Sequence, residues 1–187
     1  VDVRFGALVL KSSVDNGQTL SLAVLGDASK VTLMSTAAND ASTGLWGEGR
    51  VVFLGGDWPC VEADTHRMTA YAGYATLESA GASDNALVAG AGAIDADKEI
   101  NTLKATTTGA GQSLAIGNDA LLTLDDGALL FTGADDYAIQ GGHVQCGRTS
   151  SDLVIHQFGT GTLTLDTDLV FTNGISYVDL AFDLACV

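Results

Sequence analysis

The sequence predicts an all-β protein built as a β-solenoid, and two observations lead to this prediction. Residues 100–172 consist of short runs that alternate apolar with polar or small residues, separated by Gly, Asn and Asp, with no helical period. The apolar centres Leu114, Leu122, Leu130 and Ile139 lie about eight or nine residues apart, roughly three to a coil of twenty-odd residues. A short, regular interval of this kind favours coils that stack on one another, with their apolar side chains pointing inward.

An antiparallel β-sandwich is the alternative fold. Asp126-Gly127 and Asn173-Gly174 are dipeptides that form tight hairpin loops, and such loops would pair neighbouring strands antiparallel. A sandwich would be expected to have longer strands than the runs seen here. The β-solenoid is therefore the preferred prediction.

The composition favours one domain with a narrow core. The 187 residues leave room for a single domain, residues 1–187, of about seven to nine coils. Apolar residues make up 47% of the chain but aromatic residues only 6%, so Ala, Val, Leu and Ile must fill the interior. The 23 glycines and the single proline, Pro59, suit strands that use every backbone N–H and turns that need positive φ.

The expected strands begin near the N-terminus and continue to the end of the repetitive half. A polar loop and an irregular insertion, around residues 35–65, interrupt them. The predicted strand runs are residues 4–10, 20–25, 31–34, 51–54, 103–105, 114–116, 122–124, 129–131, 138–144, 153–155, 163–165 and 169–171, and residues 70–79 are expected to form a further strand and turn.

The irregular insertion contains both tryptophans of the chain, Trp46 and Trp58, and Tyr71 and Tyr74 follow it. These four rings are the candidate ligand-binding residues, because aromatic rings stack on sugar rings and would form a carbohydrate platform. The alternative is a local plug that covers one flank of a core made of small residues. Surface glycans are possible partners under the first interpretation.

The charge excludes one class of partner. With 23 acidic and 8 basic residues the net charge is −15, which repels the phosphate backbone of nucleic acids. The sequence has no run of eighteen apolar residues, so no membrane span is predicted, and no signal peptide is recognisable. An acidic surface of this kind is common outside the cell, and the chain has the appearance of a mature or excised piece of a longer protein.

The three cysteines, Cys60, Cys146 and Cys186, are too widely spaced for a zinc ribbon or a dense disulfide scaffold. One intramolecular disulfide with a spare thiol, a bond to a neighbouring subunit through Cys186, and three buried thiols all remain open. No metal or other cofactor is predicted, because His66, His143 and His156 lie far apart in sequence. The acidic turn with Asp95, Asp97 and Glu99 lacks the pattern of an EF-hand calcium loop.

Two adjacent acid pairs, Asp125-Asp126 and Asp135-Asp136, are the only motif that suggests catalysis. Glycoside hydrolysis needs two carboxylates that face each other, whereas neighbouring residues of a strand point to opposite sides. Both pairs stand in turn-like contexts and are expected to form Asx turns. No catalytic residue is therefore predicted, and a polysaccharide-degrading enzyme is the least favoured of the functions considered.

Several motifs in a fixed order resemble a known family. They are GLWGEGRVVFLGGDW, YAGYATLE, ASDNALV, INTLKA, SLAIGNDALLTLDDGALLFTG, YAIQGGHVQCG and DLVIHQFGTGTLTLDTDLVF, within residues 44–174. This order resembles the bacterial proteins with autotransporter-associated β-strand repeats, although the GANTYTGGT-like stretch that usually follows GTGTLTL is missing. The resemblance implies a right-handed parallel β-helix that is secreted or displayed on the cell surface, serves in adhesion or fibres, and has no conserved active site.

The sequence thus predicts a non-catalytic extracellular or cell-surface module that is structural or adhesive. Strand-like ends without a polar cap suggest that copies of the chain stack head to tail into a filament. A carbohydrate-binding module is the first alternative.

Overall fold

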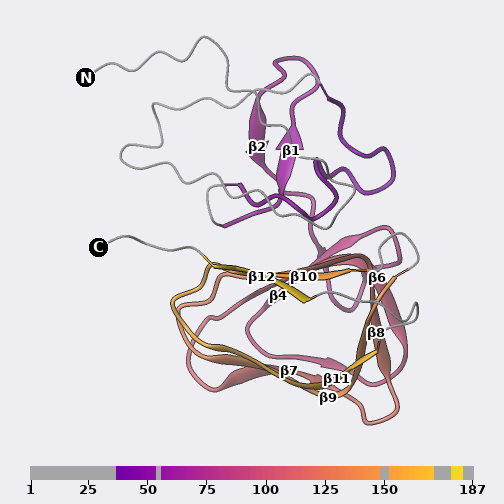
Figure 1. The fold of residues 1–187 in the computed structure, drawn as a ribbon, viewed down its shortest axis with the longest axis vertical. Helices are drawn as coiled ribbons and strands as arrows, with labels where there is room; N and C mark the ends of the chain where they lie inside the picture. The colour runs from indigo at the N-terminus through magenta and orange to yellow at the C-terminus, as the bar shows by residue number, and fades with distance from the viewer. Residues whose placement is uncertain (1–36, 54–55, 148–151, 171–177, 183–187) are drawn as a thin grey trace.

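The computed structural model describes residues 37–53, 56–147, 152–170 and 178–182, and it is a β-solenoid of about three turns (Figure 1). The described residues contain no helix. The strands predicted at residues 4–10, 20–25 and 31–34, and the thiol of Cys186, lie outside the described residues.

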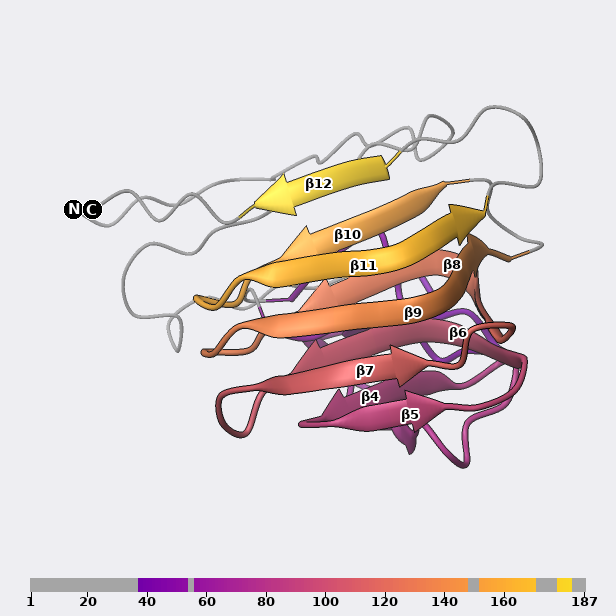
Figure 2. The ribbon, with the colours of Figure 1, turned by 90° about the horizontal axis from the view of Figure 1, so that it is seen from below.

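The strands stack in parallel, each on the strand one turn earlier (Figure 2). They are β3 (Ala75–Thr76), β4 (Asn85–Ala89), β5 (Gly92–Ile94), β6 (Lys98–Thr106), β7 (Gln112–Ile116), β8 (Leu121–Phe131), β9 (Tyr137–Cys146), β10 (Leu153–Gln157), β11 (Leu163–Val170) and β12 (Val178–Phe182). Among the described strands only β1 (Pro59–Val61) and β2 (Met68–Ala70), outside the coil, pair antiparallel, as a hairpin. The fold class predicted from the spacing is confirmed, and the sandwich is wrong.

Each turn of the coil contributes to three faces. The covered face contains β3, β4, the second parts of β6 and β8, β10 and β12. The open face contains β5, β7 and the first parts of β9 and β11. The side face is formed by residues 98–100, 122–124, 144–146 and 168–170. Three strand segments per turn is the arrangement that the interval between apolar centres predicts.

The interior is made mainly of rows of aliphatic side chains stacked in register, with the stacked rings of Phe131 and Tyr137 among them. On the covered face Leu103 lies opposite Leu129 and Leu129 opposite Ile155, and all three are buried. On the open face Leu114 lies opposite Ile139, and both are buried. Such rows bury apolar surface between every pair of coils, which is the main stabilising contribution in a core of this kind.

Corners between faces need residues with special backbone geometry. Gly141 and Gly142, where β9 bends from the open face to the side face, have φ of 77° and 40°. A Cβ atom on Gly141 would lie 2.4 Å from the carbonyl oxygen of Ile116 in the turn below. Glycine is therefore required there by both the backbone conformation and the close approach of the neighbouring coil.

The Asp126-Gly127 dipeptide is a corner of the coil and not a hairpin loop. Both residues lie inside β8, where the ladder with β6 shifts register between Ile100 and Thr102, and Gly127 has φ of 66°. The chain bends there from the side face to the covered face. A dipeptide typical of tight hairpins thus serves a parallel fold.

The described residues form about three turns of the coil, fewer than the seven to nine predicted for the chain. The length of a turn agrees with the twenty-odd residues predicted, since Leu103, Leu129 and Ile155 occupy equivalent positions about 26 residues apart. The number of turns is lower because residues 37–53 and 56–74, which we call the layer, precede the coil and pack against the outside of its covered face. Figure 1 shows the hairpin of β1 and β2 lying apart from the coil.

Candidate functional site

The candidate site is the contact between the layer and the covered face, because it holds the predicted aromatic residues and most of the buried polar groups. The outer side of this face carries two rows of side chains. One row contains Leu87, Lys104, Leu130 and His156, and the other contains Asn85, Thr102, Ala128 and Val154. Leu130, predicted to point into the coil, instead packs outward in a second hydrophobic cluster with Leu45, Val52, Trp58 and Ala128. The core of this protein is therefore divided between the coil interior and the layer contact.

Trp58 is the centre of this second cluster. Its side chain is completely buried, and its ring meets the ring of His156 edge-on at a centroid distance of 5.5 Å. The indole Nε1–H has no hydrogen-bond partner among the described residues. A ring buried in this way has no face exposed for a sugar, and this placement agrees with a plug over one flank of the coil.

The other three predicted aromatic residues are half-buried in or beside the layer. Tyr71 and Tyr74 lie edge to face, with ring centroids 5.1 Å apart. The backbone N–H of Trp46 donates to the carbonyl oxygen of Pro59 at 2.9 Å. The structure therefore brings Trp58, Tyr71 and Tyr74 together around one cluster, but not as a flat row of exposed rings.

Tyr74 also makes the polar contacts of the cluster. Its hydroxyl donates to Asp57 Oδ1 at 3.0 Å, and burial, together with the charge of Asp57, raises the pKa of Tyr74 well above its usual value. The same Asp57 oxygen pairs with the ammonium group of Lys104, and Lys104 Nζ lies 5.4 Å from the centroid of the Tyr74 ring. The phenol therefore stays protonated and donates a hydrogen bond over the whole physiological pH range.

Polar side chains of the coil anchor the layer at two further points. Asn85 Nδ2 on β4 donates to the carbonyl oxygen of Thr43 at 2.8 Å, and His156 Nε2–H on β10 donates to the carbonyl oxygen of Gly49 at 2.9 Å. With Lys104 on β6, these contacts come from three different strands of the covered face. The layer is therefore bound across successive coils and not to one strand alone. The sequence gives no signal for this, because no single motif contains residues from all three strands.

Asn85 belongs to a buried network of side chains. Its Oδ1 accepts hydrogen bonds from Asn101 Nδ2 at 2.8 Å and from Thr102 Oγ1 at 2.9 Å. All three residues are at most 1% exposed. The network satisfies polar groups that would otherwise be costly to bury beneath the layer.

The two acid pairs differ in their environments. Asp126 is buried at the corner of β8, where burial raises its pKa despite a hydrogen bond from Asn101. Asp136 is exposed, and its Oδ1 accepts a hydrogen bond from the backbone N–H of Thr162 at 2.8 Å in the next turn, which lowers its pKa. The pairs therefore take part in corner and turn contacts, and Asp136 links adjacent coils.

The remaining candidate ligands are dispersed. The described residues contain no cluster of three or more His, Cys, Asp or Glu that could hold a metal ion. His66 is exposed in the turn between β1 and β2, and His143 Nδ1 lies 3.6 Å from Asp168 Oδ2. Cys60 and Cys146 are free thiols, the first half-buried and the second buried. Burial raises the pKa of Cys146, which keeps it in the less reactive thiol form.

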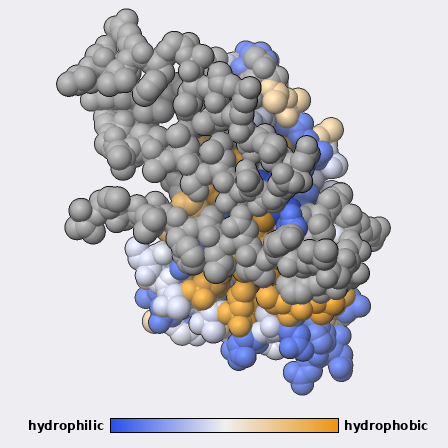
Figure 3. Space-filling model, in the orientation of Figure 1, coloured by the Kyte–Doolittle hydropathy of each residue, from blue (hydrophilic) through white to orange (hydrophobic). Residues whose placement is uncertain are grey.

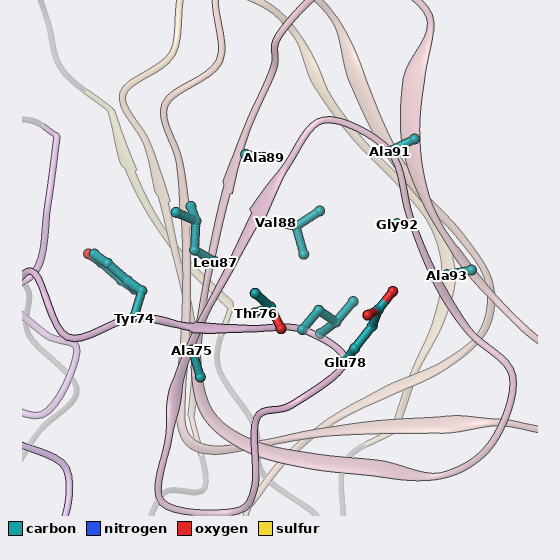
Figure 4. A pocket seen from close by; sticks show the side chains of 11 residues that line it. Tyr74, Ala75, Thr76, Glu78, Leu87, Val88, Ala89, Ala91, Gly92 and Ala93 are labelled. Carbon is teal, nitrogen blue, oxygen red and sulfur yellow. The ribbon is translucent and has the colours of Figure 1, made fainter.

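The two ends of the described coil differ. The first end has a cavity, and the last described turn has partly exposed leucine side chains. At the start of the coil a cavity of about 400 Å³ is lined mainly by small and aliphatic residues, among them Val88, Ala91 and Gly92 (Figure 4). In that view the side chain of Tyr74 points away from the cavity, toward the layer. At the last described turn Leu163, Leu165 and Leu169 are only partly buried, although they continue the rows of the core.

Figure 3 looks along the coil axis onto this last turn and shows hydrophobic side chains at the surface of the coil. Within the described chain β11 pairs with β9 alone, so the other edge of β11 has no neighbouring strand there. The described end of the coil therefore combines an unpaired strand edge with partly exposed leucines.

The open face carries a shallow polar groove of about 700 Å³. Ser113, Gln140 and Thr164 contribute polar side chains to it, with Ala138 between them. Asp135 and Asp136 lie at its margin. In contrast to the covered face, no part of the layer lies over these residues, since Gln140 and Thr164 are exposed.

Comparisons with known proteins add no relative. No protein-family model, no curated protein and no solved structure matches this chain. No helix among the described residues has the length and apolar character needed to cross a membrane. The resemblance to autotransporter-associated repeat proteins stays a prediction.

Proposed function

We propose that this chain is a non-catalytic structural or adhesive module of the bacterial cell surface or extracellular space that assembles end to end with copies of itself. The observation that supports this most is the last described turn, where core leucines are partly exposed beside an edge of β11 that pairs with no other strand of the described residues. Parallel strands add to such an edge through backbone hydrogen bonds, as they do inside the coil. A second copy would continue both the ladder and the leucine rows.

The remaining features suit a passive scaffold. The acid pairs serve corners and turns, and Trp58, Tyr71 and Tyr74 pack in the contact between the layer and the coil. Stacked ladders in which each turn contacts only its neighbours make a stiff element that needs no mobile loop. The surface location is proposed from the acidic composition and the family resemblance.

The assembly is tested by light scattering over a concentration series and by negative-stain images. Leu165→Asp should abolish concentration-dependent growth, because it places a charge in the contact between copies. Thr164→Asp is the matched control, since Thr164 neighbours Leu165 on β11 but is exposed on the outer side. Wild-type particles that remain monomeric at high concentration, or equal growth of both variants with the fold intact, would contradict the proposal.

A carbohydrate-binding module is the second candidate, favoured by the polar groove of the open face. Ser113, Gln140 and Thr164 offer hydroxyl and amide groups on successive strands, about 4.8 Å apart along the axis, which can hydrogen-bond neutral sugar hydroxyls. Glycan-array binding that is lost in Gln140→Ala, but kept in Trp58→Phe, would assign sugar binding to this groove. Loss in Trp58→Phe alone would instead favour the aromatic cluster.

A further inference from the structure

The ion pair between Lys104 and Asp57 joins the layer to the coil and is largely shielded from water. Lys104 lies on β6, in the outer row of the covered face, and Asp57 lies 47 residues earlier, beside Trp58 in the layer. Their side chains are 13% and 30% exposed. Among the described residues, neither side chain has another ion-pair partner.

The surroundings of the pair are aromatic and aliphatic. Leu87 and Leu130 lie on either side of Lys104 on the neighbouring strands, and the Tyr74 ring lies beside its ammonium group. The Tyr74 hydroxyl donates to Asp57 Oδ1. Asp57 Oδ2 makes no hydrogen bond within the described part of the chain, so it is the oxygen free to leave.

We propose that Lys104 and Asp57 condense into an intramolecular isopeptide bond. For this reaction one proton passes from the ammonium group to the carboxyl group and is carried on Oδ2, which leaves a neutral amine beside a carboxylic acid. Lys104 Nζ then attacks Asp57 Cγ and forms the C–N bond. The Cγ–Oδ2 bond breaks, and Oδ2 leaves as water with a second proton from Nζ, while Oδ1 becomes the amide carbonyl oxygen.

This reaction needs no oxidant, metal or other reactant, because the two charged groups together contain all the atoms of the amide and of one water. Two groups held in contact by a folded protein react as if at very high concentration, which drives a condensation that is unfavourable between separate molecules in water. The Tyr74 hydroxyl stabilises negative charge on Oδ1 while Nζ attacks. Tyr74 is therefore assigned a catalytic role in bond formation.

The bond would fix the layer to the coil covalently at the middle of three anchors, between the contacts of Asn85 and His156. The layer could then not separate from the covered face without breaking an amide. This inference does not depend on the proposed function, because bond formation requires only the fold of a single chain.

Intact-mass spectrometry of the folded wild-type chain under denaturing conditions tests the proposal. The expected mass is that of the sequence less one water, and digestion should yield a branched peptide that contains both residue 57 and residue 104. Lys104→Arg is the matched control, because a guanidinium keeps the ion pair but does not form the amide, so this variant should have its full sequence mass. A folded wild-type chain with full sequence mass, and with Lys104 and Asp57 in separate unmodified peptides, would overturn the proposal.

The role of Tyr74 is tested by the rate at which the linked form accumulates after synthesis. Tyr74→Phe removes the hydroxyl and keeps the ring, so linkage should slow by about 100-fold if the hydroxyl stabilises the developing charge. A folded Tyr74→Phe variant that links at the wild-type rate would contradict the catalytic role.

Discussion

The covered face and the open face are built from the same parallel ladders, yet their outer sides differ. On the covered face the outer rows contain Leu130, Ala128 and Val154, which are buried under the layer or beside it. On the open face the outer positions include Gln140 and Thr164, which are exposed. The inner rows of both faces are alike. The interior side chains therefore specify the coil, and the outer side chains specify what each face contacts.

The inner and outer rows of side chains therefore have different roles in this fold. Inner rows of leucine and isoleucine hold successive turns together through nearest-neighbour packing. Outer rows decide whether a face stays in water or receives another part of the chain. The three polar anchors and Trp58 serve this second task, and they are the groups whose removal should affect one face alone.

The largest effect is expected for Trp58→Ala. The side chain is fully buried between the layer and the covered face, so its loss should leave a cavity and lower the free energy of unfolding by about 3–5 kcal/mol. Urea denaturation measures this change. The matched control on the open face is Gln140→Ala, which should stay within about 0.5 kcal/mol of the wild type.

Trp58→Phe refines the same prediction. Because the indole N–H has no hydrogen-bond partner among the described residues, phenylalanine should retain most of the packing, and its cost should be clearly smaller than that of alanine. Equal costs for Phe and Ala, or a cost below about 1 kcal/mol for Ala, would mean that the layer contributes little to stability.

A smaller effect is expected for Asn85→Ala. This change leaves the side chains of Asn101 and Thr102 without their common acceptor and removes one anchor of the layer, at a cost of about 1–3 kcal/mol. Proteolysis should then cut the layer before the coil. Thr164→Ala, on the outside of the open face, is the control, and an equal loss of stability in both variants would contradict the special role of the buried network.

The smallest expected effect is on the pH dependence of stability, and it distinguishes Asp126 from Asp136. The pKa of Asp126 is raised by burial, so its contribution to stability is present below the unfolded pKa of 3.8 and is lost as pH rises through the folded pKa. The pKa of Asp136 is lowered by its hydrogen bond, so its contribution is present above 3.8 and is lost as pH falls.

Urea unfolding at several pH values between about 3 and 7 measures both effects. Asp126→Asn should gain stability relative to the wild type as pH rises, whereas Asp136→Asn should lose stability over the same range. If the free energy of unfolding relative to the wild type changed with pH in the same direction for both variants, Asp126 and Asp136 would not have the opposite electrostatic environments assigned to them.

Much of the coil could be predicted from local pattern. The interval between Leu114, Leu122 and Ile139 predicts three strand segments per turn, and the structure places these residues on the open face, the side face and the open face of the next turn. Leu130 shows the limit of the pattern, because Leu129, Leu130 and Phe131 are all apolar and alternation cannot say which of them points inward.

The site could be predicted only in part. Trp46, Trp58, Tyr71 and Tyr74 stand out as a concentration of aromatic residues, and three of them do meet in one cluster. Lys104 and His156 carry no such signal, because their partners, Asp57 and Gly49, lie 47 and 107 residues away. Contacts over such distances depend on how the coil places its strands side by side.

The sequence by itself determined that the chain would be all-β, that its strands would stack in parallel as a coil, and that aliphatic residues would form most of the interior. These properties follow from short-range alternation and from the spacing of glycine and apolar residues, which act within one turn. Only the tertiary structure decided the number of turns, which face the layer covers, and which charged and aromatic side chains meet there. Those outcomes depend on the register between segments far apart in the chain, and no local pattern encodes that register.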